Sequence, residues 1–231
     1  MVPPQGRPEL SEAARLEPVP PAPPSSDTRV DPDATTLTEL DDVTLVETDL
    51  AGAELDDLRL ERVAMRAVSL TGADMSDATW RDVRCDACEL SGLVAPKATM
   101  HRVELSHCRG MGLVLADAAV RNLHVVECRL DGANFRAARY EKCVFARSSL
   151  VDADFSGAQL TEAVFEECDL TRAVFHNVRC DEVRFDHCTV EGLRGVTHLS
   201  GVTVTTDEVL PLAISAFAAI GIVVDDPDDD G

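Results

Sequence analysis

The chain repeats itself every five residues along about two-thirds of its length. In steps of five from Leu45 to Val190, thirty consecutive positions are apolar or small, and only Ala95 and Gly110 are smaller than cysteine. A second class of small residues, such as Ala73, lies two positions before them. Neither an α-helix nor a simple alternating strand gives two buried and three exposed positions in every five. The pattern predicts a chain that turns a corner every five residues.

A longer period of twenty residues organises the same region. The residues that return at this spacing form ladders of glycine (Gly52, Gly72, Gly92, Gly112, Gly132, Gly192), of cysteine (Cys88, Cys108, Cys128, Cys168, Cys188, with Ser148 in the gap) and of phenylalanine (Phe135, Phe155, Phe175 and Phe145, Phe165, Phe185). Four pentapeptides per coil therefore predict a square cross-section in which like residues stack. We expect the glycine ladder to mark one corner with positive φ or close backbone approach. Residues 91–125 are the weakest stretch, where Ala95, Pro96 and Gly110 predict a local bend or a loose coil.

Several units match the motif of the pentapeptide-repeat family, usually written A(D/N)LxG. The matching units are Ala73-Asp74-Met75, Ala133-Asn134-Phe135, Ala153-Asp154-Phe155-Ser156-Gly157 and Ala53-Glu54-Leu55. The chain thus resembles this family over about residues 40–195, and its unbroken register is similar to the loop-less branch of the MfpA/Qnr-like proteins. The resemblance implies a right-handed quadrilateral parallel β-helix, an all-β pentapeptide-repeat solenoid.

The composition divides the chain into four segments. Residues 1–36 hold nine of the twelve prolines and are predicted to be a disordered, partly polyproline-II tail, in which Pro20-Pro21-Ala22-Pro23 matches the PxxP pattern of SH3 ligands. Residues 37–195 form the predicted β-helix. Residues 196–224 are predicted to form a C-terminal cap and dimerisation helix, and residues 225–231 form an acidic tail.

The C-terminal helix is predicted from an apolar run, Val209 to Ile220, that ends at Gly221. Thr206-Asp207-Glu208 gives a capping residue with acids in the first helical turn, and Pro211 as the first helical residue places the start of the helix at Leu210. A helix this apolar must cover the open end of the last coil, or also join two chains. The resemblance favours a homodimer, with Leu210, Ile214, Phe217 and Ile220 as the dimerisation residues.

One metal motif competes with the repeat. The spacing Cys85-x2-Cys88-x12-His101-x5-His107 fits a C2H2 zinc finger. The register opposes this interpretation, because both cysteines fall on inward positions and both histidines on outward ones. We therefore expect buried thiols and no metal or other cofactor. A packed, narrow solenoid also leaves no pocket for a substrate, and no catalytic constellation fits the register, so an enzyme is not expected.

Charge limits the partners. The chain has 42 Asp+Glu against 21 Lys+Arg and a formal net charge of −21. Such a surface repels phosphate, which argues against direct nucleic-acid and anionic membrane binding. No membrane span or secretory signal is visible, so a cytoplasmic location is expected. About half of the net charge, −10, lies in the solenoid at 41–195, and one face that carries many arginines is nearly neutral.

The family resemblance implies a DNA mimic that binds DNA gyrase or another type II topoisomerase and protects it from quinolones or natural gyrase poisons. The alternative is a non-catalytic interaction scaffold with an unknown partner. Thirty units at four per coil give a rod of about 36 Å, near one turn of B-DNA. The acidic residues predicted to bind the partner are Glu47, Asp49, Glu54, Asp56, Asp57, Asp74, Asp77, Asp86 and Glu89.

Overall fold

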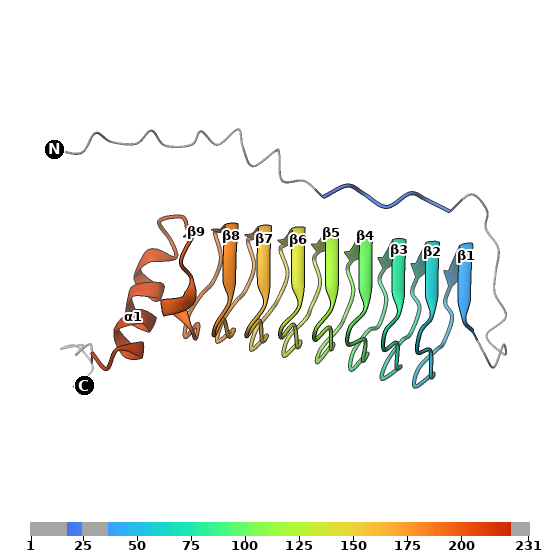
Figure 1. Ribbon diagram of the computed structural model, residues 1–231, viewed down its shortest axis with the longest axis horizontal. Helices are drawn as coiled ribbons and strands as arrows, with labels where there is room; N and C mark the ends of the chain where they lie inside the picture. Colours follow the sequence, from blue (N-terminus) through green and yellow to red (C-terminus); the bar gives the residue numbers. More distant parts are fainter. Residues whose placement is uncertain (1–17, 25–36, 223–231) are drawn as a thin grey trace.

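The computed structural model describes residues 18–24 and 37–222. The predicted acidic tail at 225–231 and most of the proline-rich tail at 1–36 lie outside the described residues. The described chain forms a parallel β-helix, with the helix α1 (Val209–Ala219) across its C-terminal end (Figure 1). Within this part of the chain, none of the helices has the length and apolar character needed to span a bilayer.

Each coil takes twenty residues and contributes one strand to a single parallel sheet. Paired residues lie twenty positions apart, as Leu60 lies opposite Trp80. Isolated bridges with the same spacing, such as Asp74 to Val94, connect the remaining sides of the coils. The strands are β1 (Glu39–Val46), β2 (Arg59–Arg66), β3 (Thr79–Asp86), β4 (Thr99–Ser106), β5 (Ala119–Val126), β6 (Arg139–Ala146), β7 (Gln159–Glu166), β8 (Arg179–Asp186) and the two-residue β9 (Val202–Thr203).

A residue with positive φ lies at every fifth position from Asp42 to Gly192, four times in each coil. We call these the corner residues. They are missing from the paired residues of adjacent strands: between β1 and β2, for example, the strand register includes neither Asp42 nor Arg62. The glycine ladder was predicted to mark one special corner. The structure shows that all four corners need positive φ and that most are filled by other residues, including Arg62 at φ 51°. Their side chains project outward, so the positive-φ conformation costs free energy but causes no clash in the core.

The two inward positions of each pentapeptide form one continuous core. All of the thirty predicted positions from Leu45 to Val190 are buried except Cys180, which is partly exposed near the C-terminal end. The phenylalanine ladders stack from coil to coil: the ring centroids of Phe145 and Phe165 lie 4.9 Å apart. The predicted parallel β-helix and its inward register are therefore confirmed.

The bend predicted within 91–125 does not occur. The ladder continues without a break from β3 through β4 to β5. The space left by Gly110 is filled by its neighbour on the next coil, because a Cβ at that position would lie 2.8 Å from Leu130 Cδ2. Neighbouring side chains thus compensate for a small residue without moving the backbone.

The acids predicted to lie in the first turn of the C-terminal helix instead precede it and attach it to the solenoid. Glu208 is fully buried, and its Oε1 accepts a hydrogen bond from the Cys188 amide at 2.7 Å. One position earlier, Asp207 contacts His187 at 2.8 Å. The same contact occurs earlier in the ladder, where the Cys128 amide donates to the hydroxyl of Ser148, twenty residues further along, at 3.0 Å. Glu208 occupies the equivalent position relative to Cys188. The side chain of Glu208 ends the ladder without a further coil.

The helix itself differs slightly from the prediction at its start. It begins at Val209 rather than near Leu210, and Pro211 occupies its first turn, where an amide donor has no partner within the helix. It ends as predicted at Gly221, whose φ is 80°, and the Ile222 amide donates to the Phe217 carbonyl at 2.8 Å. This hydrogen bond closes a Schellman-type C-terminus.

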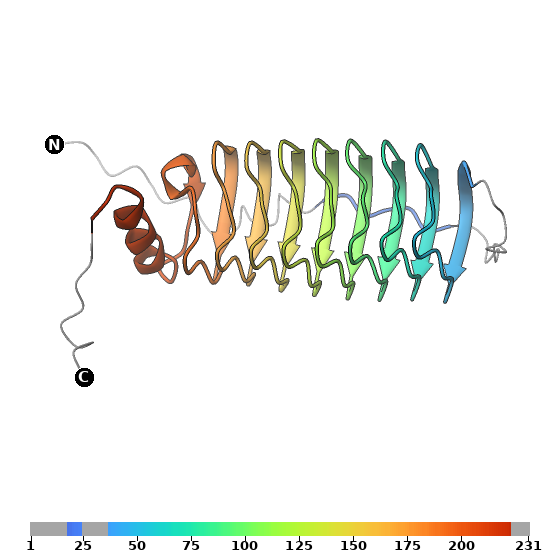
Figure 2. The same cartoon turned by 90° about the horizontal axis from the view of Figure 1, so that it is seen from below.

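Residues 18–24 were predicted to be disordered with the rest of 1–36. They instead lie extended along the outside of the solenoid, approximately parallel to its long axis (Figures 1 and 2). Their amides and carbonyls bond to residues of β3 and β5. Sequence reasoning missed this contact because no apolar periodicity accompanies it.

Two glycines with positive φ provide a matched test of the backbone. A Cβ on Gly195 would lie 2.6 Å from the Phe175 carbonyl carbon, whereas a Cβ on Gly132 would meet nothing within 4 Å. We expect Gly195→Ala to lower the free energy of unfolding by about 3 kcal/mol and Gly132→Ala by about 1 kcal/mol. Urea unfolding followed by circular dichroism measures both, and equal losses would contradict the close backbone approach at Gly195.

Candidate functional site

Because the interior is filled, the residues available to a partner are the outward ones. Three of every five solenoid residues point outward, and they divide among four sides of the rod. Each side has a row of inward residues at its centre, which serves as its name.

Five of the nine predicted acidic residues lie together on the side centred on Leu55 and Met75. We call Glu54, Asp56, Asp57, Asp74 and Asp77 the acidic patch; all five are exposed. Glu54 bridges Asp74 on the next coil, and Asp57 and Asp77 are the corner residues at the end of this side. Five carboxylates thus lie on two adjacent coils, which are about 4.8 Å apart.

One carboxylate of the acidic patch is stabilised by hydrogen bonds. The hydroxyl and amide of Ser76 both donate to Asp74, which lowers the pKa of this carboxyl below its ordinary value. Among the described residues, no cation forms an ion pair with any of the five carboxylates. The patch therefore presents an uncompensated negative charge.

The other four predicted acids do not join this group. Asp49 and Glu89 lie on the next side of the rod, where both pair with Ser69 in the ladder, and Glu47 and Asp86 lie on the side after that. Asp86 contacts His107 at 3.0 Å and so raises the pKa of that histidine above its ordinary value. These acids surround the rod rather than form one surface.

Sequence reasoning missed a set of ion pairs between adjacent coils. They join a base to an acid twenty residues away, so opposite charges at that spacing were the available signal. The pairs are Arg102–Asp82, Arg121–Glu141, Lys142–Glu162, Arg147–Glu127, Arg172–Asp152 and Arg84–Glu104. They neutralise many acids in the middle of the rod, which distinguishes that region from the acidic patch.

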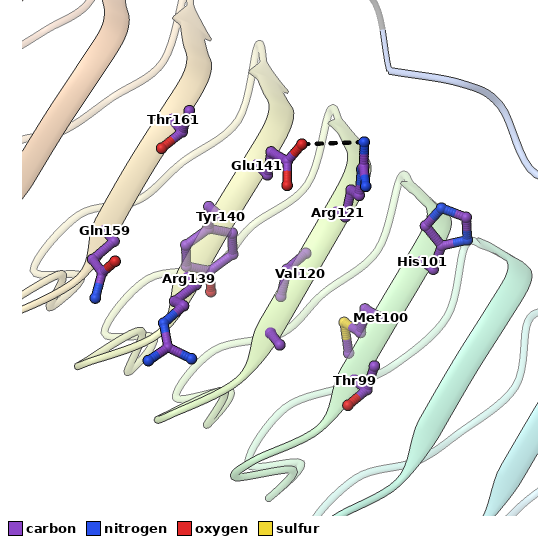
Figure 3. Close-up of a pocket in the computed structure, with 11 residues that line it drawn as sticks. Thr99, Met100, His101, Val120, Arg121, Arg139, Tyr140, Glu141, Gln159 and Thr161 are labelled. Carbon is purple, nitrogen blue, oxygen red and sulfur yellow. Dashed lines mark ion pairs between the residues drawn. The ribbon is translucent and has the colours of Figure 1, made fainter.

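The arginine-rich face carries a hollow that the sequence did not predict. This face consists of Arg59, Arg62, Arg81, Arg102, Arg121, Arg139, Lys142 and Arg179, on the side centred on Leu60 and Trp80. An open hollow of about 430 Å³ extends across β4 to β7 on this face, and Figure 3 shows Arg121 paired with Glu141 beside it. This hollow lies on the outer surface, where the expectation that a packed solenoid leaves no pocket is not met.

Nothing in the lining of the hollow forms a catalytic set. His101 on its rim is partly buried beside Arg102 and Arg81, and burial and these cations lower its pKa. Tyr140 belongs to the core, and its buried hydroxyl has no hydrogen-bond partner among the described residues. The lining offers cationic groups but no nucleophile paired with a base.

The five cysteines of the ladder are buried and form no disulfide, as predicted. Cys168 Sγ donates to the Phe145 carbonyl at 3.3 Å, and the same contact recurs at Cys108 and Cys188. Burial raises the pKa of the Cys168 thiol to about 12. Of the zinc-finger candidates, Cys85 and Cys88 lie in the core, while His101 and His107 lie outside. No group of three or more potential metal ligands occurs within residues 18–24 and 37–222.

The residues predicted for dimerisation share an exposed apolar surface on α1. Leu210, Ile214, Phe217 and Ile220 are 69%, 48%, 42% and 64% exposed. Leu212 of the helix packs on the core of the solenoid. The surface lies at the opposite end of the rod from the acidic patch (Figure 1).

Two family models match within the repeat. One, described as a pentapeptide repeat region, matches residues 124–194, and the other, described as pentapeptide repeats in eight copies, matches residues 44–82. No curated protein matches the chain.

Solved structures provide more distant similarities. Full-length QnrB1, a plasmid-mediated fluoroquinolone resistance protein, is 20% identical over 84% of this chain and 95% of its own, with a TM-score of 0.38. HetL, a pentapeptide repeat protein involved in heterocyst differentiation regulation from the cyanobacterium Nostoc, is 16% identical over 68% of this chain and 89% of its own, with a TM-score of 0.29.

Proposed function

Because the chain is a pentapeptide-repeat protein, we propose that it is a non-catalytic binding rod that takes the place of duplex DNA on a basic protein surface. The partner proposed is DNA gyrase or another type II topoisomerase, which the protein would protect from quinolones or natural gyrase poisons. The observation that carries the proposal is the acidic patch, a group of five exposed carboxyl side chains without ion-pair partners among the described residues.

The dimensions of the rod support this proposal. Nine strands spaced by about 4.8 Å extend about 38 Å, close to one turn of B-DNA at about 34–36 Å. Averaged over the solenoid, the net charge is about half as dense as that of DNA. In the acidic patch, five charges occupy two coils, or about one per 2 Å, against about one per 1.7 Å for B-DNA. The patch therefore approaches the charge density of DNA locally.

We also propose that α1 joins two chains into a homodimer. The four dimerisation residues are large, apolar and exposed, and their burial against a second copy removes them from water. Since α1 lies at the C-terminal end, an end-to-end dimer places the two acidic patches at the far ends of a rod twice as long. Two patches on one rod match a partner with two-fold symmetry.

Charge reversal of the patch tests the binding proposal. Replacing Glu54, Asp56, Asp57, Asp74 and Asp77 with lysine should raise the concentration needed to inhibit gyrase supercoiling by at least about tenfold. The matched control reverses Glu166, Glu167, Asp181, Glu182 and Glu191, which change the net charge equally, include two corner residues and are dispersed over three sides. Circular dichroism verifies that both variants fold.

The proposal expects the wild-type chain and the control to inhibit supercoiling and to relieve quinolone-induced cleavage at micromolar concentrations. If the wild-type chain does neither, gyrase is not the partner, and the interaction scaffold with another partner is the better account. If both variants lose activity equally, total charge rather than the patch is responsible.

Substitutions on α1 test dimerisation. We expect Ile214→Glu with Phe217→Glu to convert a dimer into a monomer in sedimentation equilibrium, since each buries a charge in the apolar contact. Ala219→Glu, on the opposite side of the same helix at 100° per residue, should leave the dimer intact. A wild-type chain that sediments as a monomer contradicts the proposal.

A further inference from the structure

The extended segment at 18–24 is held by side chains of the solenoid. The Val19 amide donates to Asn122 Oδ1 at 3.3 Å, and the Ala22 amide donates to Asp82 Oδ1 at 3.0 Å. Between them, the carbonyl of the buried Pro21 accepts from Arg84 Nη2 at 2.9 Å. The segment runs across β5 to β3, opposite in direction to the progress of the coils (Figure 1).

The sequence of the segment matches this pattern of acceptors. It reads Pro-Val-Pro-Pro-Ala-Pro-Pro, so Val19 and Ala22 carry its two amide donors, and both are used. The remaining positions are all proline, which has no backbone N–H group and therefore needs no acceptor. The segment therefore carries donors only where the solenoid offers acceptors.

The spacing of the donors also matches the solenoid. Polyproline-II rises about 3.1 Å per residue, so donors three residues apart are separated by about 9.3 Å. Asp82 and Asn122 occupy the same corner two coils apart, a separation of about 9.6 Å. A polyproline-II segment thus meets this corner in register, with one turn of the segment for every two coils.

Two residues of this corner are buried where the segment lies against them. Asp82 and Asn122 are buried, at 5% and 6% exposure, whereas the other corner residues of the described solenoid are not. Arg102, on the coil between them, donates to both carboxylate oxygens of Asp82 at 2.5 Å. This pairing holds the pKa of Asp82 below its ordinary value and keeps the acceptor ionised and oriented.

We propose that this corner, formed by Asp82, Arg84, Arg102 and Asn122, is a docking surface for a polyproline-II segment, and that residues 18–24 are its intramolecular ligand. The segment occupies the border of the arginine-rich face. It binds the guanidinium of Arg84 there and leaves the acidic patch uncovered. The proposal is independent of gyrase, since it concerns a different side of the rod.

Amide hydrogen exchange in the full-length, ¹⁵N-labelled chain tests the proposal. We expect the Val19 and Ala22 amides to exchange at least about tenfold more slowly than in a free peptide of the same sequence. Asn122→Gly removes an acceptor at a positive-φ position that glycine tolerates, and should abolish the protection of Val19. The control, Asn177→Gly, makes the same change at another corner with the same φ of 56° and should leave the protection unchanged.

Substitutions in the segment itself provide a second test. Ala22→Pro keeps the polyproline-II conformation but removes one donor, and should speed exchange at Val19 at least about threefold; Pro23→Ala keeps both donors and should not. Free-peptide exchange rates in the wild-type chain, or protection that survives Asn122→Gly, would overturn the proposal. Protection that increases with protein concentration would also overturn it, because the ligand would then come from a second copy.

Discussion

The solenoid depends on one backbone constraint: every fifth residue must adopt positive φ so that four short sides close into a coil. For residues other than glycine this conformation costs about 1–2 kcal/mol each. The cost is offset by the backbone hydrogen bonds between coils and by the burial of two side chains in every five. The corner side chains point away from the core, and only Asp82 and Asn122 among those of the described solenoid are buried, beneath residues 18–24. Corners therefore accept almost any residue, and the surface chemistry can vary without changing the fold.

Much of the fold could be predicted from the sequence because the interior is narrow and each position of the coil has the same surroundings in every coil. A five-residue period sufficed to identify the inward residues, and a twenty-residue period identified the stacks of cysteine and phenylalanine. The positive φ of the corners was underestimated, because glycine signals this conformation and most corners carry other residues. The bend expected near Gly110 was wrong because Leu130, a neighbour twenty residues away, fills the missing volume.

The surface was less predictable, since it depends on contacts across coils and between segments. The sequence identified nine acids, but only the structure shows that five of them share one side while Asp86 is engaged by His107. Glu208 resembled an acid of the first helical turn and instead ends the ladder at Cys188. The proline-rich tail resembled a solvated coil, although the positions of Val19 and Ala22 match acceptors forty residues apart in the solenoid.

The three surface features occupy different parts of the rod. One end carries the acidic patch, the other carries the apolar surface of α1, and the proline segment lies along a corner between them (Figure 1). In this account the acidic patch occupies the site on gyrase that duplex DNA would otherwise fill. Competition between the protein and DNA tests that claim most directly: the affinity of the full-length chain for gyrase is measured with and without saturating linear duplex. The account predicts that the duplex displaces the protein, whereas simultaneous binding of both with unchanged affinity would contradict it.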